Sequence, residues 1–317
     1  ANGKQVGAGE TTGDAHTASA MAMARSLIAH HFPFGIITKK SLPRPADHKV
    51  LVLPNVCLMD EEETKSIREW VRSGGCLLAT GWTSLANRSG QLQKDFMLAD
   101  VLGVSLKQPS WKAWEHYVAP TPAGKAYFGH FSAKYPAFAR TIGVHVEAHR
   151  EAQILATTTL PWPTNDTTKF SSIHSNPPWQ ATNRPEIVFN RYGKGRTIYC
   201  SSPIETVEVL AGTFVQLVRL LHDRFAFEVD APSCVEATLF HQPDRNRYLL
   251  NFVNFQKDLP NLPVDGIAVR LRLPKGKVKA VNRLPDAVSL PFREIDGVVS
   301  FNLHRLQTFL MVEVQTA

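Results

Sequence analysis

The sequence predicts an α/β protein, with a parallel sheet covered by helices on both faces, followed by a small all-β domain. Two apolar runs, Val50–Leu53 and Cys76–Thr80, flank a helical pattern. Short apolar runs without alternation are typical of strands that are buried on both faces of a parallel sheet. After Phe227 the helical periodicity ends, and short strand-like segments alternate with turns. We therefore expect an α/β domain over residues 1–225 and an antiparallel β-sandwich over residues 226–317.

The helix between the two apolar runs carries signals at both ends. Asp60 can cap its first turn, and the glutamates that follow are favoured by the positive end of the helix macrodipole. Gly74 and Gly75 can end the helix. Ile67 and Val71 lie four residues apart on one apolar face, which is expected to pack on the sheet. The unit is therefore a strand, a helix and a parallel strand.

The remaining elements of the first domain follow from the same periodicity rules. We expect strands at residues 4–12, 34–38, 104–106, 153–158, 186–190 and 197–201, helices at residues 14–31, 96–102 and 206–225, and loops at residues 82–95 and 161–185. The loop at residues 82–95 is expected on the surface, at the carboxyl edge of the sheet. Gly193 and Gly195 predict a hairpin turn between the last two strands.

The second domain is predicted from strands alone. They are expected at residues 234–241, 247–254, 268–273, 278–283, 298–303 and 308–314. Pro243, Asp244 and Asn246 mark a hairpin between the first two. This pattern favours a small antiparallel β-sandwich.

Charge and hydropathy argue against two classes of partner. The formal charge is +7, but Lys and Arg are scattered, with no basic run longer than the pair Lys39 and Lys40. Nucleic-acid binding usually needs a clustered basic stripe. No apolar run approaches the roughly 20 residues needed to cross a bilayer. We therefore expect neither a nucleic-acid nor a membrane partner, while localisation stays open.

No motif predicts a cofactor or a metal. Gly7, Gly9 and Gly13 are interpreted as a turn, because their spacing does not fit the G-x-G-x-x-G loop of dinucleotide sites. His145 and His149 flank Glu147 in an alternating segment that suits a strand with a solvated polar face; a metal site there is the alternative. The four cysteines lack C-x-x-C spacing and are interpreted as buried thiols.

Several segments together resemble the trimerisation domain of glycoside hydrolase family 42 β-galactosidases and its small C-terminal β domain. They are FGIITKKSL, VLVLPNVCLMDEEETKSIREWVRSGGCLLATGWTSL, KDFMLADVLGV, RPEIVFNRYGKGRTIYCSSPIE and RYLLNFVNF, in family order and over most of the chain. The resemblance implies a flavodoxin-like fold akin to class I glutamine amidotransferases, used for subunit assembly and for closing off the active site of a neighbouring barrel. The family's catalytic carboxylates lie on a preceding (β/α)8 barrel, which nothing here matches, so no catalytic residue is carried over.

The kinship with amidotransferases can be tested on the residues. Such an enzyme needs a Cys on a G-x-C-x-G elbow and a late His paired with Glu. Gly81 to Ser84 holds no Cys, and residues 201–205, which directly follow the strand that ends at Cys200, hold no His. Ser84, Ser201 and Ser202 lack G-x-S-x-G context and are interpreted as helix caps. We expect no catalytic residue in this chain.

Aromatic residues in loops near predicted strand ends form the remaining candidate site. They are Trp82, Trp111, Trp114, His116, Trp162 and Trp179, with Tyr117 beside them. Indole rings stack on sugar C–H faces, and ligands of open α/β folds bind at the carboxyl edge of the sheet. Aromatic residues are also enriched at protein interfaces, which is the favoured interpretation.

The predicted function is a non-catalytic assembly portion of a glycoside-hydrolase-like protein. Its expected partners are further copies of the chain, with a trimer as one possibility, and a glycosidase barrel in the same or a neighbouring chain. A carbohydrate-binding module acting through the aromatic loops is the alternative. A hydrolase with an unrecognised nucleophile is the second alternative.

Overall fold

The computed structural model describes residues 13–42, 48–108, 115–162, 168–170, 175–274 and 277–317. The chain divides into two compact units. The first unit comprises Ala1–Met23 and Ile37–Asp223, and the second comprises Ala24–Ile36 and Arg224–Ala317. The helix α1 (Gly13–Ala29) contributes residues to both. The expected strand at residues 4–12 lies outside the described residues. No helix in the described ranges is long and apolar enough to cross a membrane.

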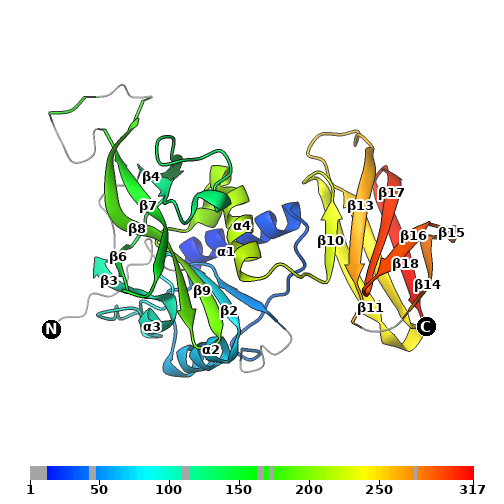
Figure 1. The fold of residues 1–317 in the computed structure, drawn as a ribbon, viewed down its shortest axis with the longest axis horizontal. Helices are drawn as coiled ribbons and strands as arrows, with labels where there is room; N and C mark the ends of the chain where they lie inside the picture. The colour runs from blue at the N-terminus through cyan, green and yellow to red at the C-terminus, as the bar shows by residue number, and fades with distance from the viewer. Residues whose placement is uncertain (1–12, 43–47, 109–114, 163–167, 171–174, 275–276) are drawn as a thin grey trace. The chain divides into compact units, whose positions relative to one another are not determined.

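A seven-stranded mixed sheet forms the centre of the first unit (Figure 1). Its strands, in sheet order, are β1 (Val50–Leu53), β2 (Cys76–Thr80), β9 (Gly195–Cys200), β8 (Pro178–Tyr192), β7 (Gln153–Pro161), β4 (Glu115–Pro120) and β5 (Ala137–Arg140). The pairings of β1 with β2 and of β2 with β9 are parallel, and every later pairing in this order is antiparallel. A separate two-stranded sheet pairs β3 (Val104–Gln108) with β6 (His145–Ala148).

The central unit of strand, helix and parallel strand is confirmed. The helix α2 (Glu61–Ser73) begins with a capping box, in which Asp60 accepts a hydrogen bond from the backbone of Glu63 and the Glu63 carboxylate accepts one from the backbone of Asp60. It ends at Gly74, which has a φ of 124°. Ile67 and Val71 are buried and belong to the core that Leu77 and Tyr199 share. The hairpin predicted at Gly193 and Gly195 is also present, between β8 and β9.

The flavodoxin-like prediction is wrong, because the structure is mostly β, with 43% strand and 20% helix. Apolar runs report burial of a strand on both faces, but they do not report the direction of its neighbours. After the three parallel strands the sheet continues through antiparallel partners. Residues 34–38 form no strand, and Ile36 is 88% exposed. The strand expected at residues 104–106 joins the separate two-stranded sheet instead.

Two further expectations in this unit are corrected. The loop after β2 is not a surface loop at its start, because residues 82–86 are buried and Ala86 forms isolated bridges with Leu58 and Leu92. The helix expected at residues 206–225 is α4 (Ala211–Leu221), preceded by the 3₁₀ turns η3 (Ile204–Thr206) and η4 (Glu208–Leu210). Val207 is extended, which separates the turns, and Val209 is exposed rather than on the apolar face.

The shorter helices of this unit and its late loop also differ in extent from the sequence prediction. The helix α3 (Ala99–Leu102) covers only the end of the expected range and stops at Gly103. A further 3₁₀ turn, η2 (Lys125–Tyr127), follows β4. The loop expected at residues 161–185 is partly strand, because β8 begins at Pro178. Part of this segment, although rich in Pro and Asn, therefore forms a strand of a long hairpin, because β7 is its antiparallel partner.

The second unit contains two antiparallel sheets whose apolar side chains share one core. One sheet has the order β10 (Phe227–Asp230), β13 (Val264–Arg272), β17 (Val298–Leu306) and β16 (Phe292–Ile295). The other has the order β11 (Val235–Gln242), β12 (Arg247–Asn254), β18 (Phe309–Thr316), β14 (Val278–Leu284) and β15 (Val288–Ser289). The hairpin between β11 and β12 turns through η5 (Pro243–Arg245) and Asn246, which has a φ of 48°. All six predicted strands are present; β10, β15 and β16 were missed because they are short.

Candidate functional site

The carboxyl ends of β1, β2 and β9 meet at one edge of the sheet, where ligands of parallel sheets usually bind. The chain turns sharply there. Gly81 has a φ of 59°, and a Cβ at this position would lie 2.4 Å from Asn55 Oδ1. That oxygen accepts a hydrogen bond from the Trp82 backbone at 2.8 Å. The turn therefore needs glycine both for its left-handed backbone and for the close approach of Asn55.

Glu186, on β8, is fully buried beside this edge and collects several hydrogen-bond donors. Its Oε2 accepts bonds from Ser201 Oγ at 2.9 Å and from Thr158 Oγ1 at 3.0 Å, and its Oε1 accepts one from Ser202 Oγ. His116 Nε2 lies 3.6 Å from Oε1. Burial by itself raises the pKa of Glu186, but His116 and the serine hydroxyls outweigh burial and hold this pKa below its usual value.

Glu205 is the second buried carboxyl group at this edge. Its Oε1 accepts hydrogen bonds from Ser19 Oγ at 2.7 Å and Thr80 Oγ1 at 2.8 Å, which tie α1 to the end of β2. Its Oε2 has no hydrogen-bond partner within the described ranges. Burial raises the pKa of Glu205 to about 6, because the two hydroxyl donors do not offset the loss of hydration.

This cluster of carboxyl and hydroxyl groups has the residue types of a hydrolytic site but not its arrangement. A nucleophilic serine needs its hydroxyl bonded to a base and open to substrate. Ser201 and Ser202 instead donate to Glu186, and both are 0% exposed, as are Glu186 and His116. The expectation that these serines cap a helix is corrected, since they hold a carboxylate. Chemically, the cluster can hold a buried charge and join β7 and β8 to the end of β9.

His116 shows what sequence reasoning missed. Residues 201–205 after the Cys200 strand hold no histidine, whereas His116 approaches Glu186 from β4. The antiparallel pairings of β7 with β8 and with β4, which bring β4 close to Glu186, were not predicted. One signal was available, because Glu186 is a carboxylate directly before the apolar run Ile187–Phe189 and therefore a candidate for burial with partners.

The aromatic candidates that the structure describes lie in different places. Trp82 is only 7% exposed and belongs to the core, and His116 lies beside Glu186. Trp111 and Trp114 lie outside the described residues. Trp162 and Trp179 do meet, at the outer end of the β7–β8 hairpin, with ring centroids 4.4 Å apart and rings at 84°.

The Trp162–Trp179 pair forms an open aromatic corner. Lys169 Nζ lies over both rings, 5.2 Å from the centroid of Trp162 and 5.6 Å from that of Trp179. Trp162 Nε1 donates to the Phe170 carbonyl at 3.2 Å, and Phe170 is 87% exposed. Trp179 itself is 57% exposed. Large exposed aromatic groups at one place usually mark a contact site, because water solvates them poorly.

The histidine segment does not assemble a metal site among the described residues, where no group of three or more His, Cys, Asp or Glu side chains is placed to hold an ion. Glu147 pairs with Lys107 at 3.4 Å, and His149 Nε2 lies 3.0 Å from Ser105 Oγ. The cysteines are free, with Cys57, Cys76 and Cys200 buried and Cys234 half-buried. Burial raises the pKa of the Cys57 thiol to about 11, so this thiol stays protonated at neutral pH.

Comparison with known proteins gives one family match. Residues 11–130 match the family model described as the β-galactosidase trimerisation domain. A search of curated protein sequences finds no match.

Several solved structures share the fold. An α-L-fucosidase isoenzyme 2 from Paenibacillus thiaminolyticus superposes with a TM-score of 0.77 at 22% identity, over 94% of this chain and 45% of the fucosidase. A GH42 β-galactosidase from G. stearothermophilus gives a TM-score of 0.62 at 16% identity, over 93% of this chain and 36% of the enzyme. A β-galactosidase from Bacillus circulans sp. alkalophilus gives 0.62 at 13% identity, over 94% and 37%. The chain spans less than half the length of each of these proteins.

Proposed function

We propose that this chain is a non-catalytic assembly portion of a glycoside-hydrolase-like protein. The observation that carries the proposal is the match of residues 11–130 to a trimerisation domain, supported by a shared fold with glycosidases that are more than twice as long. In this role the chain binds further copies of itself and lies against a glycosidase barrel in the same or a neighbouring chain.

The buried cluster around Glu186 supports the non-catalytic part of the proposal. The hydroxyl groups at the sheet edge are consumed by two carboxylates, and they are closed to solvent. A hydrolase that used Ser201 or Ser202 would have to open the core first. The surfaces left for function are therefore outside this edge, and the Trp162–Trp179 corner is the exposed aromatic surface of the first unit that we assign to subunit contact.

Sedimentation equilibrium of the chain at micromolar concentrations tests the proposal. We expect a mass about three times that of the single chain, as the description of the matched family model implies. The test variant is Trp179→Ala, which removes the exposed indole and is expected to shift the sedimentation mass toward that of the monomer. A strict monomer across the whole concentration range would overturn the assembly role.

A carbohydrate site at the same corner is the second candidate, favoured by the exposure of Trp179 and its perpendicular partner Trp162. Sugars bind such corners through C–H contacts with the ring faces. The same variant separates the two roles. If Trp179→Ala leaves the sedimentation mass unchanged and abolishes binding of methyl β-D-galactopyranoside, the corner is a sugar site.

A further inference from the structure

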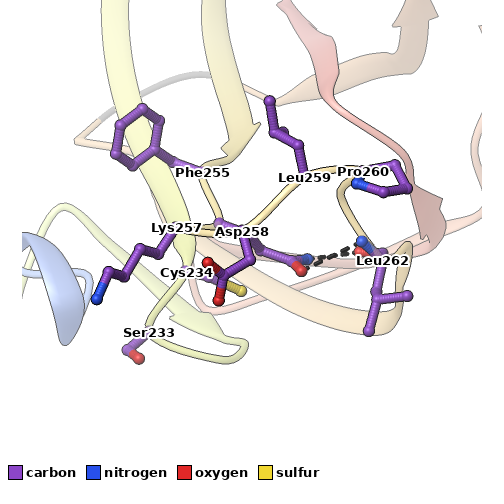
Figure 2. Close-up of a pocket in the computed structure, with 9 residues that line it drawn as sticks. Ser233, Cys234, Phe255, Lys257, Asp258, Leu259, Pro260 and Leu262 are labelled. Carbon is purple, nitrogen blue, oxygen red and sulfur yellow. Dashed lines mark hydrogen bonds between the residues drawn. The ribbon is translucent and has the colours of Figure 1, made fainter.

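A loop of the second unit, residues 254–262 between β12 and β13, borders a cavity (Figure 2). The cavity has a volume of about 680 Å³, and Ser233 and Cys234 close its other side. Small-molecule sites in proteins usually measure roughly 300–1,000 Å³. The size therefore fits a ligand of one or two sugar rings.

The loop is held in place by its own side chains. Gln256 Nε2 donates to the Leu262 carbonyl at 2.6 Å, and the Leu262 backbone donates to Gln256 Oε1 at 3.2 Å, as the dashed lines in Figure 2 show. Asn254 Nδ2 donates to the same carbonyl at 2.8 Å, and Asn261 Nδ2 donates to the Asn254 carbonyl at 2.6 Å. A ligand that binds here does not have to order the loop, which lowers the entropic cost of binding.

Three polar side chains around the cavity keep their hydrogen-bonding capacity. Lys257, Asp258 and Ser233 make no side-chain hydrogen bond or ion pair with any residue that the structure describes. In Figure 2, Lys257 and Asp258 point away from Phe255, toward the side on which Ser233 lies. A ligand in the cavity can therefore bind an ammonium donor, a carboxylate acceptor and a hydroxyl group that can donate and accept.

The combination of these groups selects a chemical class. A phosphate is repelled by the Asp258 carboxylate, and a simple amine is repelled by the Lys257 ammonium group, so a ligand whose charges are all of one sign faces repulsion from one side chain. A neutral polyol avoids both, because each of its hydroxyl groups donates to a carboxylate and accepts from an ammonium group. Pro260 and Leu262, the latter 71% exposed, supply apolar surface for the C–H face of a sugar ring.

We infer that the cavity beside residues 254–262 is a binding site for a neutral pyranose, with Asp258 and Lys257 holding adjacent hydroxyl groups and Ser233 holding a third. The site is separate from the Trp162–Trp179 corner and does not depend on the assembly role. Its groups are exposed and compete with water, so the affinity for one ring is weak, with a Kd of about 1 mM.

Amide NMR of the full chain during titration with methyl β-D-galactopyranoside tests the site. We expect saturable shifts confined to residues 233–234 and 255–262. Asp258→Ala should weaken binding about tenfold, since a hydrogen bond to a charged group is removed. Lys257→Met should weaken it severalfold and serves as the second variant. The matched control is Asp265→Ala, which removes an exposed carboxylate on β13 and should leave Kd within about twofold.

Three outcomes would overturn the inference. One is a titration without saturable shifts at these residues. A second is binding that Asp258→Ala and Lys257→Met both leave unchanged. The third is saturation by inorganic phosphate but not by the sugar, which would assign the cavity to an anion. Sedimentation of the same samples reports the assembly role separately, so either idea can fail while the other stands.

Discussion

Glu186 and Glu205 both lie buried at the carboxyl edge of the parallel strands, but their surroundings act on them in opposite directions. Glu186 receives three hydroxyl donors and lies beside His116, and its pKa is lowered. One oxygen of Glu205 accepts two hydrogen bonds, and the other accepts none from the residues that the structure describes. The pKa of Glu205 is raised to about 6. Burial alone therefore does not decide the charge state of a carboxyl group. The number and placement of its hydrogen-bond donors also decide it.

The difference also bears on function. An edge that in other parallel sheets receives ligands is here filled by the protein's own polar groups. Glu186 ties β7, β8 and β9 together through hydroxyl groups, and Glu205 ties α1 to β2. Both carboxyl groups therefore serve cohesion of the first unit. The predictions below test this account, starting with the largest expected effect.

Replacing Glu186 by Ala should cost about 3–5 kcal/mol of unfolding free energy, because the hydroxyl groups lose their buried acceptor and His116 loses the carboxylate beside it. Urea unfolding at pH 7 measures this loss. Since the folded pKa of Glu186 is lowered, its contribution is present above the unfolded value of 4.5 and is lost as pH falls through the folded pKa. The matched control Glu208→Ala, at an exposed position, should change stability by less than about 0.5 kcal/mol. A loss below about 1 kcal/mol for Glu186→Ala would contradict the account.

Replacing Glu205 by Gln should remove a pH dependence of about 2 kcal/mol. The folded pKa of about 6 lies above the unfolded value of 4.5, so the stability that Glu205 contributes is complete below pH 4.5 and is lost as pH rises through 6. The stability of the variant relative to the wild type should therefore rise between pH 4.5 and pH 8. Unfolding free energies at both pH values measure the gain. A difference between the two proteins that does not change with pH would refute the role of Glu205, and Glu208→Gln is the control.

Ser19→Ala sharpens the comparison by taking one of the two donors from Glu205. We expect a loss of about 1 kcal/mol at pH 8, where Glu205 is ionised, since a buried hydrogen bond to a charged group is removed. The loss should shrink at pH 4.5. Thermal unfolding of the variant and the wild type at the two pH values measures it. An equal loss at both values would mean that Ser19 acts through packing alone.

Trp179→Ala should have the smallest effect on stability, within about 0.5 kcal/mol, because the indole is 57% exposed. Its effect is expected on the sedimentation mass instead. Phe240→Ala in the second unit is a close control, since Phe240 is also 57% exposed. If both variants lower the mass equally, the Trp162–Trp179 corner has no special role in assembly.

The sequence predicts best what depends on local signals. The helix cap at Asp60, the glycines after α2, the β8–β9 hairpin and the six predicted strands of the second unit are all confirmed. The pairing of distant strands is not local, and the antiparallel pairings of β7 with β8 and β4, and of β4 with β5, were missed for that reason. The same failure hid the contact between His116 and Glu186, whose residues lie far apart in the chain and meet only through β4, β7 and β8.

The aromatic candidates differ in a property that the sequence does not supply. A list of aromatic loop residues could not distinguish Trp82, which is in the core, from Trp162 and Trp179, which meet in the open. Exposure is a property of the folded chain, so residue type alone does not supply it.

The central claim is that the edge of the parallel strands is filled by structure and carries no reactive group. Incubation of the chain with a fluorophosphonate, which labels activated serines, followed by mass spectrometry, tests it most directly, together with an assay of nitrophenyl glycosides on the same sample. We predict no label on Ser201 or Ser202 and no turnover. Stoichiometric labelling of either serine, accompanied by turnover that Glu186→Gln abolishes, would contradict the claim.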